Sequence, residues 1–228
     1  MATHVRNARK KSKAPLIVGL ILAVIVLAAV VALIWIDANC IFIGGKLYRQ
    51  GDTIDLRGGE VSVAEYEALR EEYPDNVILW SVPIGSRRFD NDSVSVKVDN
   101  YSESEIASFA YLPELRSIDA TEADCYDAIM KTVAAYPDCT VTWSVKLGGT
   151  AYPGNSTELA LSSPVTAAEL ESHIKYLPEL QSVDLRAAGL SDAEEDALVS
   201  AFPELSFMRE YEICGKSFDT SLEELDLS

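Results

Sequence analysis

One stretch, residues 180–194, constrains the fold of this chain more than any other. Apolar residues recur in it at spacings of two, three and five, and a serine is followed three residues later by a glutamate. The apolar spacing predicts a short strand followed by a turn into the core. The Ser-x-x-Glu pair is a capping box, which marks the first turn of a helix. The residues concerned are Leu180, Val183, Leu185 and Leu190, and then Ser191 and Glu194.

This strand, turn and helix pattern recurs along the chain with a period of about 64 to 65 residues. Equivalent tripeptides begin at Ile54, Ile118 and Val183. Each capping box opens a segment with helical spacing that ends near a proline, which cannot continue a helix. The boxes are Ser62/Glu65, Ser102/Glu105, Thr166/Glu169 and Ser191/Glu194, with Thr121/Asp124 as a weaker version.

Two strands with strict alternation each carry a tryptophan on the apolar face, Trp80 and Trp143, which we expect in the core. Arg209 stands at the equivalent position of the third copy. Either that end of the repeat is more loosely packed, or Arg209 pairs with an acid such as Glu223 or Glu224.

An apolar segment near the N-terminus is long enough to cross a membrane. Residues 16–36 carry no charge, and at 1.5 Å per residue a helix over them spans about 31 Å. Five basic residues precede it, and the first acid is Asp37, so the N-terminus is expected on the cytoplasmic side. A cleaved signal peptide is the alternative, but its apolar region would be shorter and would end in small residues.

These features predict a single-pass protein of the cell membrane with its C-terminal domain outside the cytoplasm. The expected parts are a basic cytoplasmic tail at 1–14, a transmembrane helix at 15–36 and an ectodomain at 37–228. Of 19 basic and 36 acidic residues, five basic ones lie in the tail, which leaves 14 against 36 and a charge of −22 on the ectodomain. That charge disfavours binding to nucleic acid or docking onto anionic lipid.

Leu180-x-x-Val183-x-Leu185-x-x-Ala188-x-Leu190 resembles the leucine-rich repeat consensus. Ala188 stands where the consensus has asparagine, so the side-chain ladder of that position is missing. Further matches lie at residues 115–125, in part at 54–61, and incompletely at 222–227.

Over about residues 40–228 the chain is similar to divergent, membrane-anchored leucine-rich repeat proteins of bacteria. The resemblance implies the fold class α/β, as a short leucine-rich-repeat-like solenoid that follows one N-terminal transmembrane helix. It implies strands on one side, helices on the other, and protein recognition as the usual function. It implies no catalytic residues.

Enzyme chemistry has no support in the sequence. His4 lies in the predicted tail, and His173 lies on a predicted helix where we expect it to be solvated. No metalloprotease, nucleophile-elbow or phosphate-loop motif is present. We therefore expect no enzyme activity, no catalytic residues, no metal and no cofactor. Cys125 and Cys139 fall at apolar positions of the repeat and are expected to be small core residues, although a bridge between them stays open.

The candidate binding face consists of residues that occupy one slot, between two inward-facing apolar residues of a strand. Because side chains alternate along a strand, these residues point to the solvent side of the sheet. Such a face suits a basic protein or a cation, and the alternative is a solvated strand face that discourages aggregation. The residues are Asp55, Lys97, Asp119, Asp184 and Asp226.

Two functions follow as hypotheses. The first is a membrane protein that presents an acidic repeat ectodomain to an unknown protein partner at the cell surface. The second is an assembly protein of the envelope, in which the edge formed by Leu225 and Leu227 pairs with a partner or with a second copy. Calcium binding by the acidic slot is a third and weaker possibility.

Overall fold

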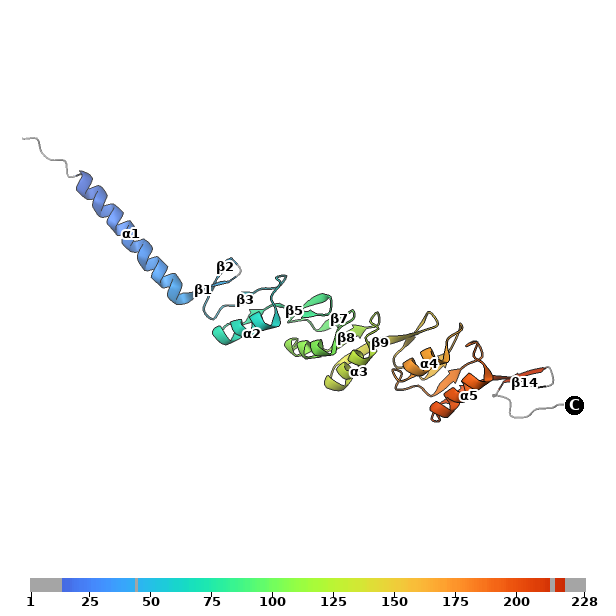
Figure 1. Cartoon of the computed structure of the whole chain (residues 1–228). Helices are drawn as coiled ribbons and strands as arrows, with labels where there is room; N and C mark the ends of the chain where they lie inside the picture. The colour runs from blue at the N-terminus through green and yellow to red at the C-terminus, as the bar shows by residue number, and fades with distance from the viewer. Residues whose placement is uncertain (1–13, 44, 214–215, 220–228) are drawn as a thin grey trace, which may run out of the picture. The chain divides into compact units, whose positions relative to one another are not determined.

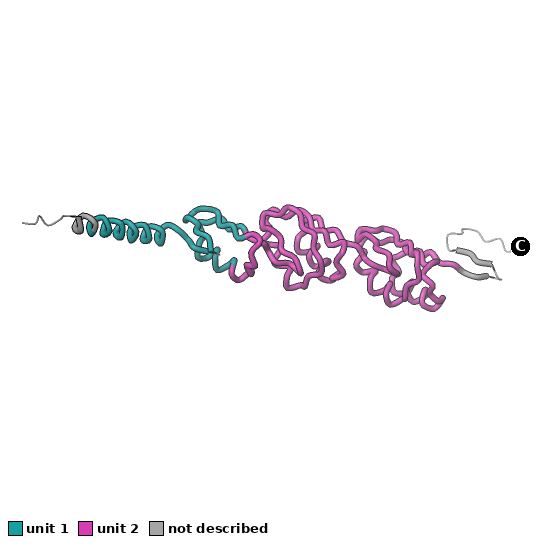
Figure 2. The backbone as a smooth tube through the Cα atoms, turned by 90° about the horizontal axis from the view of Figure 1, so that it is seen from above, with its two compact units in different colours: residues 1–56, 66–79 teal, residues 57–65, 80–228 magenta. Residues whose placement is uncertain are grey.

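The computed structural model describes residues 14–43, 45–213 and 216–219. It is a mixed α/β protein with one long apolar helix near its N-terminus. The predicted basic tail lies outside the described residues, except for Ala14. The chain divides into two compact units. Unit 1 comprises residues 1–56 and 66–79, and unit 2 comprises residues 57–65 and 80–228 (Figure 2).

Five α-helices, one 3-10 helix and fifteen short strands make up the described part of the chain (Figure 1). The helices are α1 (Ala14–Asn39), α2 (Val63–Glu72), η1 (Glu103–Tyr111), α3 (Tyr126–Ala135), α4 (Ala167–Ile174) and α5 (Asp192–Ala201). The strands are β1 (Cys40–Ile43), β2 (Lys46–Arg49), β3 (Ile54–Asp55), β4 (Ile78–Leu79), β5 (Ser81–Ile84), β6 (Arg87–Asp90), β7 (Ser95–Lys97), β8 (Ser117–Ala120), β9 (Thr140–Leu147), β10 (Thr150–Pro153), β11 (Glu158–Ala160), β12 (Ser182–Asp184), β13 (Ser206–Met208), β14 (Glu210–Ile213) and β15 (Lys216–Asp219).

Helix α1 extends beyond the predicted span of residues 15–36 at both ends and has 26 residues. Among the described residues it is the one helix long and apolar enough to cross a membrane, and it fits a membrane anchor or a signal sequence. The side-chain amide of Asn39 donates to the carbonyl of Trp35 at 2.9 Å and so pairs one of the carbonyls left open at a helix end. Strand β1 begins at the next residue, Cys40, so no linker separates helix and strand.

Unit 1 contains a hairpin and a pair of parallel strands around a small apolar core. β1 pairs antiparallel with β2, and β3 pairs in parallel with β4. Ile41, Ile54 and Ile78 are buried at the centre. Tyr66 and Leu69 of α2 pack against them, because they lie three residues apart on one face of the helix.

Unit 2 contains one arrangement twice. Strands β7, β8 and β9 form a parallel ladder, and strands β11, β12 and β13 form a second one. Successive strands are connected by η1 and α3 in the first ladder and by α4 and α5 in the second. Parallel pairing requires such crossovers, since a tight turn would reverse the chain. β9 runs on into a hairpin with β10, which separates the two ladders in sequence.

Each parallel sheet of unit 2 buries one face under its helices. Ile118 and Val183, at the centres of β8 and β12, are fully buried. From the helices, Ile129, Leu170 and Leu198 are buried as well. The predicted alternation is therefore confirmed for these strands, and the residues on either side of Ile118 and Val183 point to the open face.

The predicted capping boxes account for most of the helix starts. The carboxylates of Glu65, Glu105 and Glu194 accept from the N–H and hydroxyl of the serine three residues before them. At the fourth box the Thr166 hydroxyl accepts from the Glu169 N–H. The box at Glu105 opens the 3-10 helix η1 rather than an α-helix.

The prediction that Thr121 and Asp124 start a helix is wrong. Helix α3 begins at Tyr126, with Cys125 as its N-cap. The Thr121 hydroxyl donates to the Asp119 carboxylate at 2.6 Å instead. It stabilises the turn after β8 and does not cap the helix, which begins five residues later at Tyr126.

Two glutamates of these capping boxes also hold the preceding hairpins. The N–H of Gly85, in the turn of β5–β6, donates to Glu105 at 2.8 Å. The N–H of Gly148, in the turn of β9–β10, donates to Glu169 at 3.2 Å. Each hairpin turn is thereby fixed to the N-terminus of the helix that follows it.

The turn of β9–β10 offers a matched pair of glycine substitutions. Gly148 and Gly149 both have positive φ, at +54° and +80°. A Cβ on Gly148 would lie 2.6 Å from Ser163 Oγ and 2.9 Å from Val165 Cγ1, whereas one on Gly149 would meet nothing within 4 Å. We expect Gly149→Ala to lower the free energy of unfolding by about 1 kcal/mol through backbone strain alone. Gly148→Ala should lower it by about 3 kcal/mol, because the packing clash is added. Chemical denaturation followed by circular dichroism measures both, and equal losses would show that the contact with Ser163 is not decisive.

Tyr101 gives a prediction about alkaline stability. Its hydroxyl lies 2.8 Å from Thr132 Oγ1, and both side chains are buried. Thr132 donates to the Ala128 carbonyl, so the phenol donates to Thr132. Burial raises the pKa of Tyr101 from 10.0 to about 12, which means that the fold favours the neutral phenol. The contribution of Tyr101 to the free energy of unfolding is complete below pH 10 and is lost as the pH rises from 10 to about 12.

A spectroscopic titration of tyrosinate in the near ultraviolet should contain a late step near pH 12. Tyr101→Phe should remove that step and make unfolding less dependent on pH in this range. A titration in which the variant keeps the late step would contradict the assignment.

Candidate binding surface on the open strand faces

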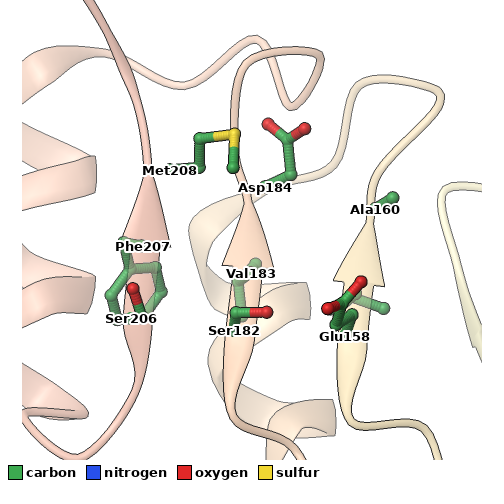
Figure 3. A pocket seen from close by; sticks show the side chains of 9 residues that line it. Glu158, Ala160, Ser182, Val183, Asp184, Ser206, Phe207 and Met208 are labelled. Atoms are coloured by element: carbon green, nitrogen blue, oxygen red, sulfur yellow. The ribbon is translucent and has the colours of Figure 1, made fainter. Parts of the chain in front are cut away.

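The open face of β11–β12–β13 forms a shallow hollow of about 550 Å³ (Figure 3). Two rows of side chains cross the three strands in register. The backbones of Leu159, Val183 and Phe207 lie between the rows and form the floor, because the side chains of Leu159 and Val183 are buried on the helix side. The rows are Glu158, Ser182 and Ser206, and then Ala160, Asp184 and Met208.

Small side chains on the open face explain the hollow. Ser182 and Ala160 reach only a short way above the sheet, whereas Glu158 and Met208 stand at its two sides (Figure 3). Met208 is 36% exposed, because no helix covers this face of its strand. The hollow thus combines accessible apolar surface, hydroxyl groups and carboxylates.

The sheet β7–β8–β9 has an equivalent open face with short polar side chains. In the first row the Ser117 hydroxyl donates to Ser95 Oγ at 2.8 Å, and Thr140 is paired with Ser117 on the next strand. In the second row Lys97 and Asp119 are register partners. Unlike the open face of β11–β12–β13, this face has no large apolar side chain at its edge.

The structure brings together only part of the predicted binding face. Lys97 and Asp119 lie side by side on β7 and β8, whereas Asp184 belongs to the other sheet, where its neighbour is Ala160. Asp55 lies on β3 in unit 1. The fifth predicted member, Asp226, lies outside the described residues.

The aspartates of unit 2 are engaged in the turns that follow their strands. Asp119 accepts from the N–H of Thr121 at 3.0 Å as well as from its hydroxyl. Asp184 accepts from the N–H of Arg186 at 3.1 Å and from its guanidinium at 2.7 and 2.9 Å. These hydrogen bonds lower the pKa of both carboxyl groups. Their first role is therefore local: they hold the backbone where the strand ends.

Lys97 is also paired, with Glu122 at 2.8 Å. The residues best placed to receive a ligand are instead those on the first row and at the edge, Glu158, Ser182 and Met208. None of the three was predicted from the sequence. Strand alternation could have identified them. Glu158 and Ser182 lie two residues before a slot position on the same strand, and Met208 occupies the slot position of β13.

His173 is half-buried, so it is less solvated than predicted, and its Nδ1 lies 2.8 Å from the Glu169 carbonyl. Its ring packs edge-on against Tyr126 at 5.6 Å and near Tyr176 at 6.3 Å. Lys175 lies over the Tyr176 ring at 4.6 Å. The cluster borders a hollow of about 340 Å³, but its rings are mostly buried and act as packing between α3 and α4.

The two tryptophans differ in burial. Trp80 is fully buried and packs edge-on against Tyr111 at 5.7 Å. Trp143 is half-buried, and its Nε1 donates to the Tyr176 carbonyl at 3.0 Å. Each tryptophan thus joins its strand to the helical segment that follows, and the prediction of a core position is confirmed fully for Trp80 and in part for Trp143.

Arg209 pairs with Asp196 of α5 at 2.7 Å, so the prediction that it pairs with an acid is confirmed. Glu223 and Glu224 lie outside the described residues. Beside it Glu195 is buried at the position that Ile129 occupies in α3, and burial raises the pKa of its carboxyl. The third copy therefore has charged residues, Glu195 and Arg209, at two positions where the second copy has Ile129 and Trp143. The positive charge of Arg209 partly offsets the cost of burying the Glu195 carboxyl.

The cysteines form no disulfide among the described residues. Cys40, Cys125 and Cys139 are free and half-buried. The Tyr101 N–H points at Cys125 Sγ at 3.5 Å. Burial raises the pKa of the Cys125 and Cys139 thiols, which keeps them in the less reactive neutral form.

Within the described part of the chain, no group of three or more His, Cys, Asp or Glu side chains is placed to hold a metal ion. No known protein family, curated protein or solved structure matches the chain. The arrangement that remains is a pair of open sheet faces, of which β11–β12–β13 has the larger hollow.

The local role of the slot aspartates can be tested by comparing two alanine variants on neighbouring strands. Asp119→Ala removes two hydrogen bonds to Thr121 and should lower the free energy of unfolding by about 1 to 2 kcal/mol. Lys97→Ala removes an exposed ion pair and should change it by less than about 0.5 kcal/mol. Thermal unfolding at neutral pH measures the difference. If both variants unfold at the same temperature, the carboxylate of Asp119 does not stabilise the turn.

Proposed function

We propose that this chain is a single-pass membrane protein whose ectodomain is a short leucine-rich-repeat-like solenoid that binds another protein at the cell surface. The basic residues before α1 support an N-terminus on the cytoplasmic side. The alternation of parallel strands and helices in unit 2 supports the repeat architecture. So does the recurrence of the capping box and the hairpin in successive copies.

The observation that carries the proposal is the open face of β11–β12–β13. A sheet with one face buried under helices and the other hollowed and accessible is suited to receive a partner, since the partner can cover the face without displacing the core. Protein–protein interfaces combine an apolar part with polar groups around it. Met208 supplies the apolar part, and Glu158 and Asp184 supply the acidic groups.

The charge of the ectodomain indicates the chemistry of the partner. At −22 from residue 37 onward, it attracts a basic surface and speeds encounter with it. Asp184 is already neutralised by Arg186, so Glu158 is the stronger attractor on this face. A partner with lysine or arginine beside a small apolar side chain therefore fits best.

The assembly function depends on Leu225 and Leu227, which lie outside the described residues. It stays a prediction, as does a role for Asp226.

A photoreactive amino acid at Ser182, in intact cells, tests the proposed face. The matched control carries it at Glu171, an exposed residue on α4 of the same copy. We expect a defined protein adduct from position 182 and none from position 171. Glu158→Lys should lower the yield of that adduct about tenfold, a loss equivalent to about 1.4 kcal/mol, whereas Glu171→Lys should leave it unchanged.

Both charge reversals are on exposed positions and should change stability by less than about 0.5 kcal/mol. Equal adducts from positions 182 and 171 would count against the face as the binding site. So would an adduct from position 182 that is insensitive to Glu158→Lys in a folded protein.

A further inference from the structure

The hairpin β1–β2 exposes an apolar pair that its own core does not use. Phe42 and Leu47 are register partners and share the outward face of the hairpin. They are 72% and 53% exposed, and Phe42 is more exposed than the large apolar side chains of α1 over residues 19–39, of which the highest value is 65%. The opposite face, with Ile41 and Tyr48, packs into the core of unit 1.

The other hairpins show that an apolar outward pair is not needed for this structure. Inward positions keep the same chemistry in the three hairpins whose side chains are described: Ile41 and Tyr48 correspond to Val82 with Phe89 and to Val145 with Tyr152. The outward position changes from copy to copy. The register partners there are Phe42 and Leu47, Pro83 and Arg88, and Lys146 and Ala151.

The apolar pair also stands at a fixed distance from the end of α1. Phe42 follows Asn39 by three residues, so even a fully extended chain places it within about 10 Å of the helix end. The N–H of Gln50 donates to the Asn39 carbonyl at 3.0 Å, which ties the second strand of the hairpin to the same point. The uncharged run ends at Ile36, and the headgroup layer beyond a hydrocarbon core is roughly 5 to 8 Å thick.

The charge of the hairpin differs from that of the rest of the ectodomain. Between Asp37 and Asp52 there is no acidic residue, whereas Lys46 and Arg49 are both present and exposed. Arg49 is the register partner of Cys40 and so shares the outward face with Phe42. A basic residue beside exposed aromatic and aliphatic side chains is the composition that binds at the boundary of headgroups and acyl chains.

We propose that the β1–β2 hairpin docks into the headgroup layer of the membrane that α1 crosses. Phe42 and Leu47 lie at the acyl boundary, and Arg49 on the same face contacts lipid phosphates. Lys46, the register partner of Ile43 on the opposite face, adds positive charge beside them. This rests on the membrane span of the proposed function and adds a second contact with the lipid. The hairpin then restricts how the base of the ectodomain can tilt about the helix end.

Depth-dependent fluorescence quenching of the full chain tests this. The protein is placed as single copies in lipid nanodiscs whose acyl chains carry bromine near the headgroup. Tryptophan replaces Leu47 in a Trp35→Phe background, and that background alone supplies the signal of Trp80 and Trp143. The matched control places the tryptophan at Ala151, the exposed residue at the equivalent position of β9–β10.

We expect brominated lipid to quench the added emission at position 47 about twofold, as for a side chain at the acyl boundary, and to leave position 151 unchanged. Adding anionic lipid should deepen the quenching, and Lys46→Gln with Arg49→Gln should abolish that increase.

The wild-type protein separates failure of this proposal from failure of the proposed function. If bromine quenches Trp35 of the wild type but not position 47, the span exists and hairpin docking is overturned. If Trp35 is not quenched, both are overturned. Emission at position 47 that responds to the number of copies per disc, and not to bromine, would mean that a second copy covers the pair and would also overturn the proposal.

Discussion

The Glu105 carboxylate accepts hydrogen bonds from two elements at once, the N-terminus of η1 and the turn of the preceding hairpin. Glu169 makes the equivalent bond to the next hairpin, while Thr166 caps α4. A buried or partly buried turn amide needs a partner, and a carboxylate at a helix N-terminus is a strong one. One capping box thus connects a hairpin to the helix that follows it, through Glu105 alone in the first case and through Glu169 with Thr166 in the second. The two helices concerned, η1 and α4, are crossovers between parallel strands of the two ladders.

Each sheet of unit 2 has one face committed to packing and one face left for other uses. The packed face is filled by Ile118, Val183 and the helices, and it leaves little freedom of residue choice. On the open face two demands compete. Asp119 and Asp184 hold the turns that follow their strands, whereas Glu158 and Met208 stand free for contact in the β11–β12–β13 hollow. Function is therefore better sought beside the recurring aspartates than at them. The same logic applies to the hairpins, where the outward pair varies and the inward residues do not.

Much of the fold could be predicted from local pattern, and the failures have physical causes. Capping boxes at Ser62, Ser102 and Ser191 were readable because their hydrogen bonds join residues three apart. The helix start predicted at Thr121 was wrong because its hydroxyl can either cap a helix or donate to Asp119. The turn after β8 decides between the two. The candidate site was predicted only in part. Strand alternation gave the correct face, but which residues of that face are occupied by internal bonds depends on contacts with the following turn.

The sequence by itself determined the apolar helix, the order of strands and helices, and the face of each strand that is buried, because all of these follow from the spacing of neighbouring side chains. Tertiary structure alone decided the pairing of Arg209 with Asp196 and the burial of His173 among tyrosines, since these residues meet only after the helices pack. It also decided that Phe42 and Leu47 face outward together, because that depends on the register of β1 against β2. Spacing along the chain sets what each element can bury, whereas packing and register set which side chains remain exposed to a partner.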